Sequence, residues 1–146
     1  NRRVPDSKPT NLFRQNSSSS TLDLKAMNMS GPKYQGETTT ISSQKVYHGY
    51  GSVHWPDGSY YEGNFHYGSK AGHGKYLYPN GNIYDGDWSN DMMNGQGQYV
   101  LKDGSYYKGF FVDNLFHGKG EQTWIDGSKY KGTYQQGERS GNGKYE

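Results

Sequence analysis

The chain has 146 residues, a net charge of +2 and no cysteine, which excludes a disulfide framework and any cysteine-based metal site. Only 29% of the residues are hydrophobic, whereas 15 tyrosines and 22 glycines are unusually many. The length allows one domain, no apolar run approaches membrane length and no signal peptide is visible, so we expect an intracellular protein.

Residues 1–45 are rich in serine and threonine and poor in large apolar side chains, which predicts an extended tail that is disordered on its own. Seven basic and three acidic residues give this tail a net charge of +4. The stretch from Ser20 to Met27 carries the signals of a short helical turn. We expect the tail to cross neighbouring proteins; the alternative is that it lies on its own sheet. Its candidate anchors on a partner are Leu12, Phe13, Leu22 and Leu24.

From residue 46 onward, three kinds of marker recur every 23 residues without an insertion. They are a Tyr-x-Gly-x-aromatic run, a Gly-x-Gly pair and an Asp-Gly or Asn-Gly turn. A fixed period of this length indicates a repeat architecture, in which one unit cannot bury its apolar face alone. The markers predict a repeat sheet over residues 46–146. It consists of a half repeat at 46–60 and repeats that start at Tyr61, Tyr84, Tyr107 and Tyr130, the last of them incomplete.

Within one unit, the alternation in 61–65 and 74–78 predicts two antiparallel strands. We expect Phe65 and Gly72 to lie opposite each other across an even loop of four residues. The next connection, at 79–81, has odd parity and predicts a three-residue turn with a left-handed glycine. The predicted fold is therefore all-β, an elongated single-layer antiparallel meander of 23-residue hairpins that follows an irregular N-terminal tail.

The glycines of each unit fall on the same face as the aromatic residues. A residue without a side chain leaves room for a neighbouring ring to lie flat across the backbone, and ring pairs add about 0.5–1.5 kcal/mol beyond their area burial. We expect Gly63 to pair with Gly74 and Tyr61 with Tyr76. The predicted repeat core is Tyr61, Gly63, Phe65, Gly72, Gly74, Tyr84, Gly86, Trp88, Gly95, Gly97, Tyr107, Gly109, Phe111, Gly118, Gly120, Tyr130, Gly132, Tyr134, Gly141 and Gly143.

The stretch YKGTYQQGERSGNGKY, from Tyr130 to Tyr145, resembles a MORN repeat, and the resemblance covers residues 46–146. Departures are Gln122 in place of an aromatic residue, and Asp91 and Asn114 in place of a turn glycine. The resemblance implies a non-enzymatic structural scaffold that joins other protein chains of a large complex, in a cilium (axoneme, radial spoke) or the cytoskeleton. Two alternatives stay open: a membrane-tethering module for anionic lipid such as phosphoinositide, and a regulatory arm of an enzyme whose catalytic domain lies elsewhere.

No nucleophile–base pair, nucleotide loop or calcium loop is present, so we expect no catalytic, cofactor or metal site. The repeat part carries nine basic and eleven acidic residues, a net charge of −2. This mixture argues against nucleic acid and makes membrane contact secondary. Apolar residues on or near the solvent face are candidate partner contacts, the alternative being that they pack against loops. These candidates are Tyr60, Ile83, Tyr106 and Phe110.

Overall fold

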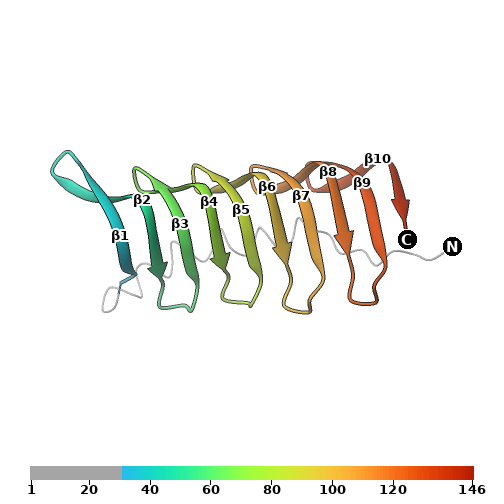
Figure 1. The fold of residues 1–146 in the computed structure, drawn as a ribbon, viewed down its shortest axis with the longest axis horizontal. Helices are drawn as coiled ribbons and strands as arrows, with labels where there is room; N and C mark the ends of the chain where they lie inside the picture. The colour runs from blue at the N-terminus through green and yellow to red at the C-terminus, as the bar shows by residue number, and fades with distance from the viewer. Residues whose placement is uncertain (1–30) are drawn as a thin grey trace.

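The computed structural model describes residues 31–146, and this part of the chain forms one open sheet of ten strands without a helix. The strands lie side by side in chain order, each antiparallel to the next, along the long axis of the molecule (Figure 1). The predicted all-β meander is therefore confirmed. The strands are β1 (Lys33–Ile41), β2 (Gln44–His54), β3 (Tyr60–His66), β4 (Ser69–Leu77), β5 (Ile83–Ser89), β6 (Met92–Val100), β7 (Tyr106–Val112), β8 (Leu115–Thr123), β9 (Lys129–Gln135) and β10 (Glu138–Tyr145).

The sheet begins earlier than the sequence pattern indicates, because β1 lies inside the segment that we expected to be tail. Tyr34 and Gly36 form a further Tyr-x-Gly, and Gly36 pairs with Gly51 just as Gly63 pairs with Gly74. The glycines of the first pair are 15 positions apart and those of the second 11, so the first hairpin is longer by four residues. Because of these four additional residues, Tyr34 does not fit the 23-residue period. The predicted start of the sheet at residue 46 is therefore wrong.

The hairpin between β3 and β4 has a two-residue loop, not the predicted four. Tyr67 and Gly68 have φ values of 46° and 91°, which is the pattern of a type I′ turn. Phe65 consequently lies opposite Lys70, while Gly72 pairs with Trp88 of β5. A bulge in β4 that contains Gly72, at a φ of 64°, adds two residues between Lys70 and Gly74 and so restores the predicted pairing of Gly63 with Gly74.

The three-residue turn between β4 and β5 is as predicted. The N–H of Tyr78 donates to the carbonyl of Asn82 (2.9 Å), and the N–H of Gly81 donates back to the carbonyl of Tyr78 (3.0 Å). Gly81 has a φ of 92°, a left-handed value that glycine adopts without strain. Asn80 or an aspartate precedes the glycine in every such turn, and its side chain accepts the N–H of the second residue after it.

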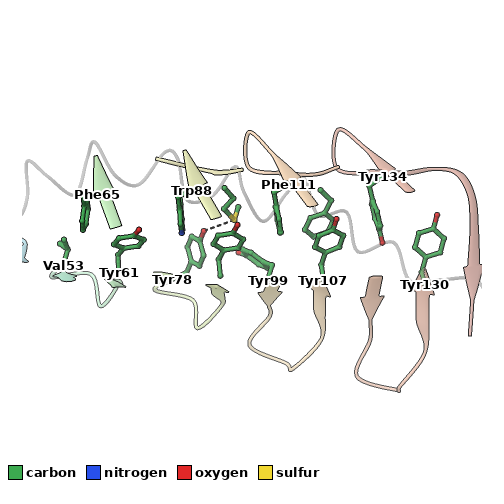
Figure 2. Close-up of a cluster of buried hydrophobic side chains, with 13 residues drawn as sticks. Val53, Tyr61, Phe65, Tyr78, Trp88, Tyr99, Tyr107, Phe111, Tyr130 and Tyr134 are labelled. Carbon is green, nitrogen blue, oxygen red and sulfur yellow. Dashed lines mark hydrogen bonds between the residues drawn. The ribbon is translucent and has the colours of Figure 1, made fainter. Parts of the chain in front are cut away.

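The core is a set of rings on one side of the sheet, which we call the aromatic face. In each repeat the tyrosine and the aromatic residue four positions later meet edge to face; Tyr84 and Trp88, for example, have ring centroids 5.0 Å apart and an interplanar angle of 89°. This geometry is favourable for aromatic quadrupoles. The opposite side, which carries Glu62, Lys75 and their equivalents, is called the polar face. Figure 2 shows the two rows of rings, with Phe65, Trp88, Phe111 and Tyr134 above Tyr61, Tyr107 and Tyr130.

Candidate functional site

The repeated element of the aromatic face is a tyrosine ring that lies across two glycines. A Cβ added to Gly97 would come within 2.5 Å of the Tyr84 ring, and one added to Gly86 would meet the backbone of Gly97 at 2.5 Å. The hydroxyl of Tyr84 donates to the carbonyl of Asp87 at 2.7 Å, which fixes the ring. Tyr61 and Tyr107 repeat this hydrogen bond at 2.7 and 2.8 Å.

The two glycines of each Gly-x-Gly pair have different functions. The second, such as Gly74 or Gly97, makes room for the ring. The first, such as Gly72 or Gly95, forms the bulge at a positive φ, with values of 64° and 106°. Sequence reasoning assigned the ring-clearing function to both, since position alone does not distinguish a bulge from a regular strand.

Burial has a clear electrostatic consequence for the tyrosines of the aromatic face. Removal from water disfavours the phenolate, so the pKa of each central repeat tyrosine rises well above its ordinary value of about 10. The pKa of Tyr134 rises for the same reason. These hydroxyls therefore stay neutral hydrogen-bond donors and are unsuited to act as bases near neutral pH.

Two cations lie among the rings of the aromatic face. The ammonium of Lys70 is 5.3 Å from the ring centre of Trp88 and 5.4 Å from that of Tyr76, and it pairs with Asp91 at 3.2 Å. Arg139 lies 5.6 Å from the ring centre of Tyr130. Met93 and Phe116 occupy the same repeat position in the middle of the sheet. Cation–π contact thus takes the place of apolar packing towards the two ends.

A further row on the aromatic face, which we call the open aromatic row, remains partly accessible. It consists of Trp55, Leu101 and Trp124, which precede three-residue turns, and Tyr76 of β4, whose ring centre lies 5.6 Å from that of Trp55. All four are half-buried and pack against the fully buried core. Ile125 beside it is 71% exposed. Tyr78 holds the same repeat position as Trp55, Leu101 and Trp124 and is buried, so the partial exposure of these three depends on how much each turn covers, which the repeat pattern does not determine.

The hairpin ends are linked laterally. The N–H of Asp91 donates to the carbonyl of Lys70 (3.1 Å), and the N–H of Lys70 donates to the Asp91 carboxylate (2.8 Å). Asn114 and Met93 make the same reciprocal pair at 3.0 and 2.8 Å. Asp91 and Asn114 therefore keep the left-handed turn, with φ values of 64° and 69°, and add an acceptor that glycine lacks. These bonds brace each hairpin against the previous one.

The predicted partner contacts on the sheet fall into two places. Tyr60, Ile83 and Tyr106 are half-buried and share one row of the polar face. Phe110, which is 37% exposed, lies in a different row, opposite Gln96. The predicted tail anchors Leu12, Phe13, Leu22 and Leu24 lie outside the described residues.

The histidines also have defined surroundings. His73 lies 2.8 Å from the Asp85 carboxylate and 3.8 Å from that of Asp87 on the polar face, while the ring of His48 packs 4.6 Å from that of Tyr67. Across residues 31–146, His, Asp and Glu do not gather into a group that could hold a metal ion. The same residues include no helix that is long and apolar enough to cross a membrane.

The fold and these contacts define a single-sheet repeat protein whose units are joined by rings over glycines. A model of the MORN repeat matches residues 43–60, 61–83, 84–106, 107–129 and 130–146. The chain therefore belongs to the family of MORN-repeat proteins. MORN repeats are non-catalytic units that generally bind proteins or lipids. Among curated proteins none matches the chain.

Proposed function

We propose that this protein is a non-enzymatic scaffold that holds other chains of a large intracellular assembly, in a cilium or the cytoskeleton. The observation that carries the proposal is the open aromatic row. Half-buried aromatic and aliphatic side chains that line a rigid sheet are typical of protein-binding surfaces, because they present a large apolar area at a low entropic cost. The ciliary or cytoskeletal location rests on the family resemblance alone.

The regular repeat of the sheet supports a spacing function. Repeats with an unbroken 23-residue period give a sheet whose attachment points recur at regular intervals, since each hairpin advances it by about 9.5 Å. The reciprocal bonds at Asp91 and Asn114 couple successive hairpins at their ends. A partner bound to the open aromatic row would therefore be held at a fixed position along the long axis.

The charge pattern supports a protein partner over anionic lipid. Along the polar face, acidic and basic residues alternate: Glu62 pairs with Lys75 and Lys75 with Asp85. An anionic membrane surface attracts clusters of like positive charge, at about 1 kcal/mol for each basic residue near the surface. An alternating row offers no such cluster, and the net charge of the repeat part is −2.

Fractionation of ciliated cells that express the tagged full chain tests this function. We expect the chain in the detergent-resistant axonemal or cytoskeletal fraction, and we expect the double variant Trp55→Ala/Trp124→Ala to move to the soluble fraction while keeping its β-sheet circular dichroism. The matched control is Lys102→Ala, an exposed turn residue. Release of the wild type by detergent, together with its co-sedimentation with phosphoinositide vesicles, would instead support the lipid alternative.

A further inference from the structure

An apolar row runs along the polar face of the sheet. The strand register makes Tyr60 a neighbour of Leu77, Leu77 of Ile83, Ile83 of Val100, and Val100 of Tyr106. We call these five residues the apolar stripe. Leu77 is 37% exposed and the other four are half-buried. Contiguous apolar side chains on an otherwise polar face indicate a contact surface.

A row of mostly charged residues runs beside the apolar stripe. In each strand its member lies two residues from the stripe residue, after it in one strand and before it in the next. Its members, one from each strand from β3 to β9, are Glu62, Lys75, Asp85, Gln98, Lys108, Glu121 and Lys131. The neutral Gln98 is at the middle, on β6. From β3 to β9 the charges are −, +, −, 0, +, −, +. In the reverse order, from β9 to β3, they are +, −, +, 0, −, +, −, so each charge would lie opposite a charge of the other sign if the row faced a reversed copy of itself.

We propose that the polar face is an interface between two copies of this chain, related by a two-fold axis that runs parallel to β6 between the two sheets. Such an axis reverses the order of the strands but keeps each row opposite the same row. Asp85 then faces Lys108 of the second copy, and Lys75 faces Glu121 of the second copy. Within the row of the apolar stripe, Val100 faces Val100 and Ile83 faces Tyr106 of the second copy, while Leu77 and Tyr60 face Thr123 and Lys129.

The charge row specifies this register. If the axis moved by half a strand spacing, to between β6 and β7, Asp85 would face Glu121 and Lys75 would face Lys131, and both contacts would be repulsive. Exposed ion pairs contribute little to affinity individually, whereas like charges in contact are strongly disfavoured. The charges therefore select the arrangement, and burial of Ile83, Val100 and Tyr106 against each other supplies the affinity.

Some of the charged side chains already have partners within the chain, and these contacts leave them accessible. Lys131 lies 3.3 Å from Glu121, and His73 lies 2.8 Å from Asp85. The Asp85 side chain is 50% exposed in that pair and the Lys131 side chain 54%. The seven strands and about 20 Å along each strand give a footprint of roughly 600 Å² per copy, somewhat below the usual 800 Å², so we expect a weak, micromolar dimer.

Sedimentation velocity of the full chain over the micromolar range tests the proposal. We expect concentration-dependent dimers for the wild type. Asp85→Lys places a lysine opposite the native Lys108 at two symmetric contacts, and Lys108→Asp places an aspartate opposite the native Asp85 in the same way. Each variant alone should therefore raise the dissociation constant at least about tenfold. Glu138→Lys makes the same charge change as Asp85→Lys outside the footprint and should have no effect.

An equimolar mixture of the two variants gives the decisive result. In the mixed dimer, the new lysine at position 85 faces the new aspartate at position 108, and the native Lys108 faces the native Asp85, so dimers should return. Mixing cannot relieve any damage inside a single chain, which separates an interface effect from misfolding. A wild type that stays monomeric into the high micromolar range, variants that dimerise normally, or a mixture that stays monomeric would each overturn the proposal.

Discussion

Gly97→Ala is the substitution that most sharply tests how the sheet is held together. The added Cβ would lie 2.5 Å from Cε2 of Tyr84, so the ring, which is fully buried, has to move. Overpacking of this kind costs about 1–3 kcal/mol. A shifted ring also loses its hydrogen bond to the Asp87 carbonyl, which is worth about 1 kcal/mol. We therefore expect a loss of roughly 2–4 kcal/mol in the free energy of unfolding.

Urea unfolding followed by circular dichroism measures this loss, and Gln96→Ala is the matched control. Gln96 precedes Gly97 in β6 and is exposed on the polar face, so its truncation should change the free energy of unfolding by less than about 0.5 kcal/mol. If the two variants are equally stable, the ring does not lie against the strand, and the explanation of the second glycine in each pair is wrong.

Substitution by asparagine distinguishes a glycine that is needed for a left-handed φ from a glycine that is needed to leave space for a ring. Gly104 has a φ of 94° and nothing within 4 Å of an added Cβ, so it is needed for the turn and not for space. Asparagine tolerates left-handed φ values, so Gly104→Asn should cost less than Gly104→Ala. At Gly97 the order should reverse, because the larger side chain meets the same ring. The same order at both sites would contradict the distinction.

Three further predictions concern the buried tyrosines, the hairpin ends and the half-buried Lys70. Because the pKa values of the buried tyrosines are raised in the fold, stability is complete below about pH 10 and falls above it, by about 1.4 kcal/mol per pH unit for each such tyrosine. Loss of circular dichroism should therefore coincide with ionisation of the buried tyrosines, the last part of the tyrosinate absorbance to appear. An absorbance that corresponds to all 15 tyrosines in a chain that is still folded would contradict this. Asp91→Gly should lower the free energy of unfolding by about 1–2 kcal/mol, and Asp91→Asn should lower it by less, because asparagine retains the acceptor for the Lys70 amide. If urea unfolding shows the same loss for both variants, Asp91 does not have this function. Lys70→Met should change stability by less than about 1 kcal/mol, because Met93 fills the same position one repeat later, and a loss above about 2 kcal/mol would show that the cation is required.

Much of the fold follows from the sequence because the period repeats without insertion. Strand alternation correctly predicts that Gly63 pairs with Gly74 and Tyr61 with Tyr76, and turn chemistry correctly predicts the left-handed Gly81. Two errors have physical causes. A hairpin extended by four residues hides β1, and the bulge at Gly72 takes up two residues that the prediction assigned to the loop between β3 and β4.

The interaction surfaces are less predictable, because exposure depends on what neighbouring turns and tips cover. The half-buried state of Trp124 and the acceptor supplied by Asp91 both arise between repeats, where a single-repeat pattern carries no information. The charge row can be recognised as complementary to its own reverse only when the register of all strands from β3 to β9 is known. Strand parity does place Tyr60, Ile83 and Tyr106 on one face, and the binding functions of these three residues remain predictions.

Site-specific photo-crosslinking in the native assembly tests the scaffold function most directly. A photoreactive amino acid at Leu101 samples the open aromatic row, and one at Lys119 samples the polar face away from that row. We expect position 101 to crosslink to a defined site on another protein, and position 119 not to reach that site. Crosslinks from position 101 to lipid alone, or to no other molecule in the intact assembly, would contradict it.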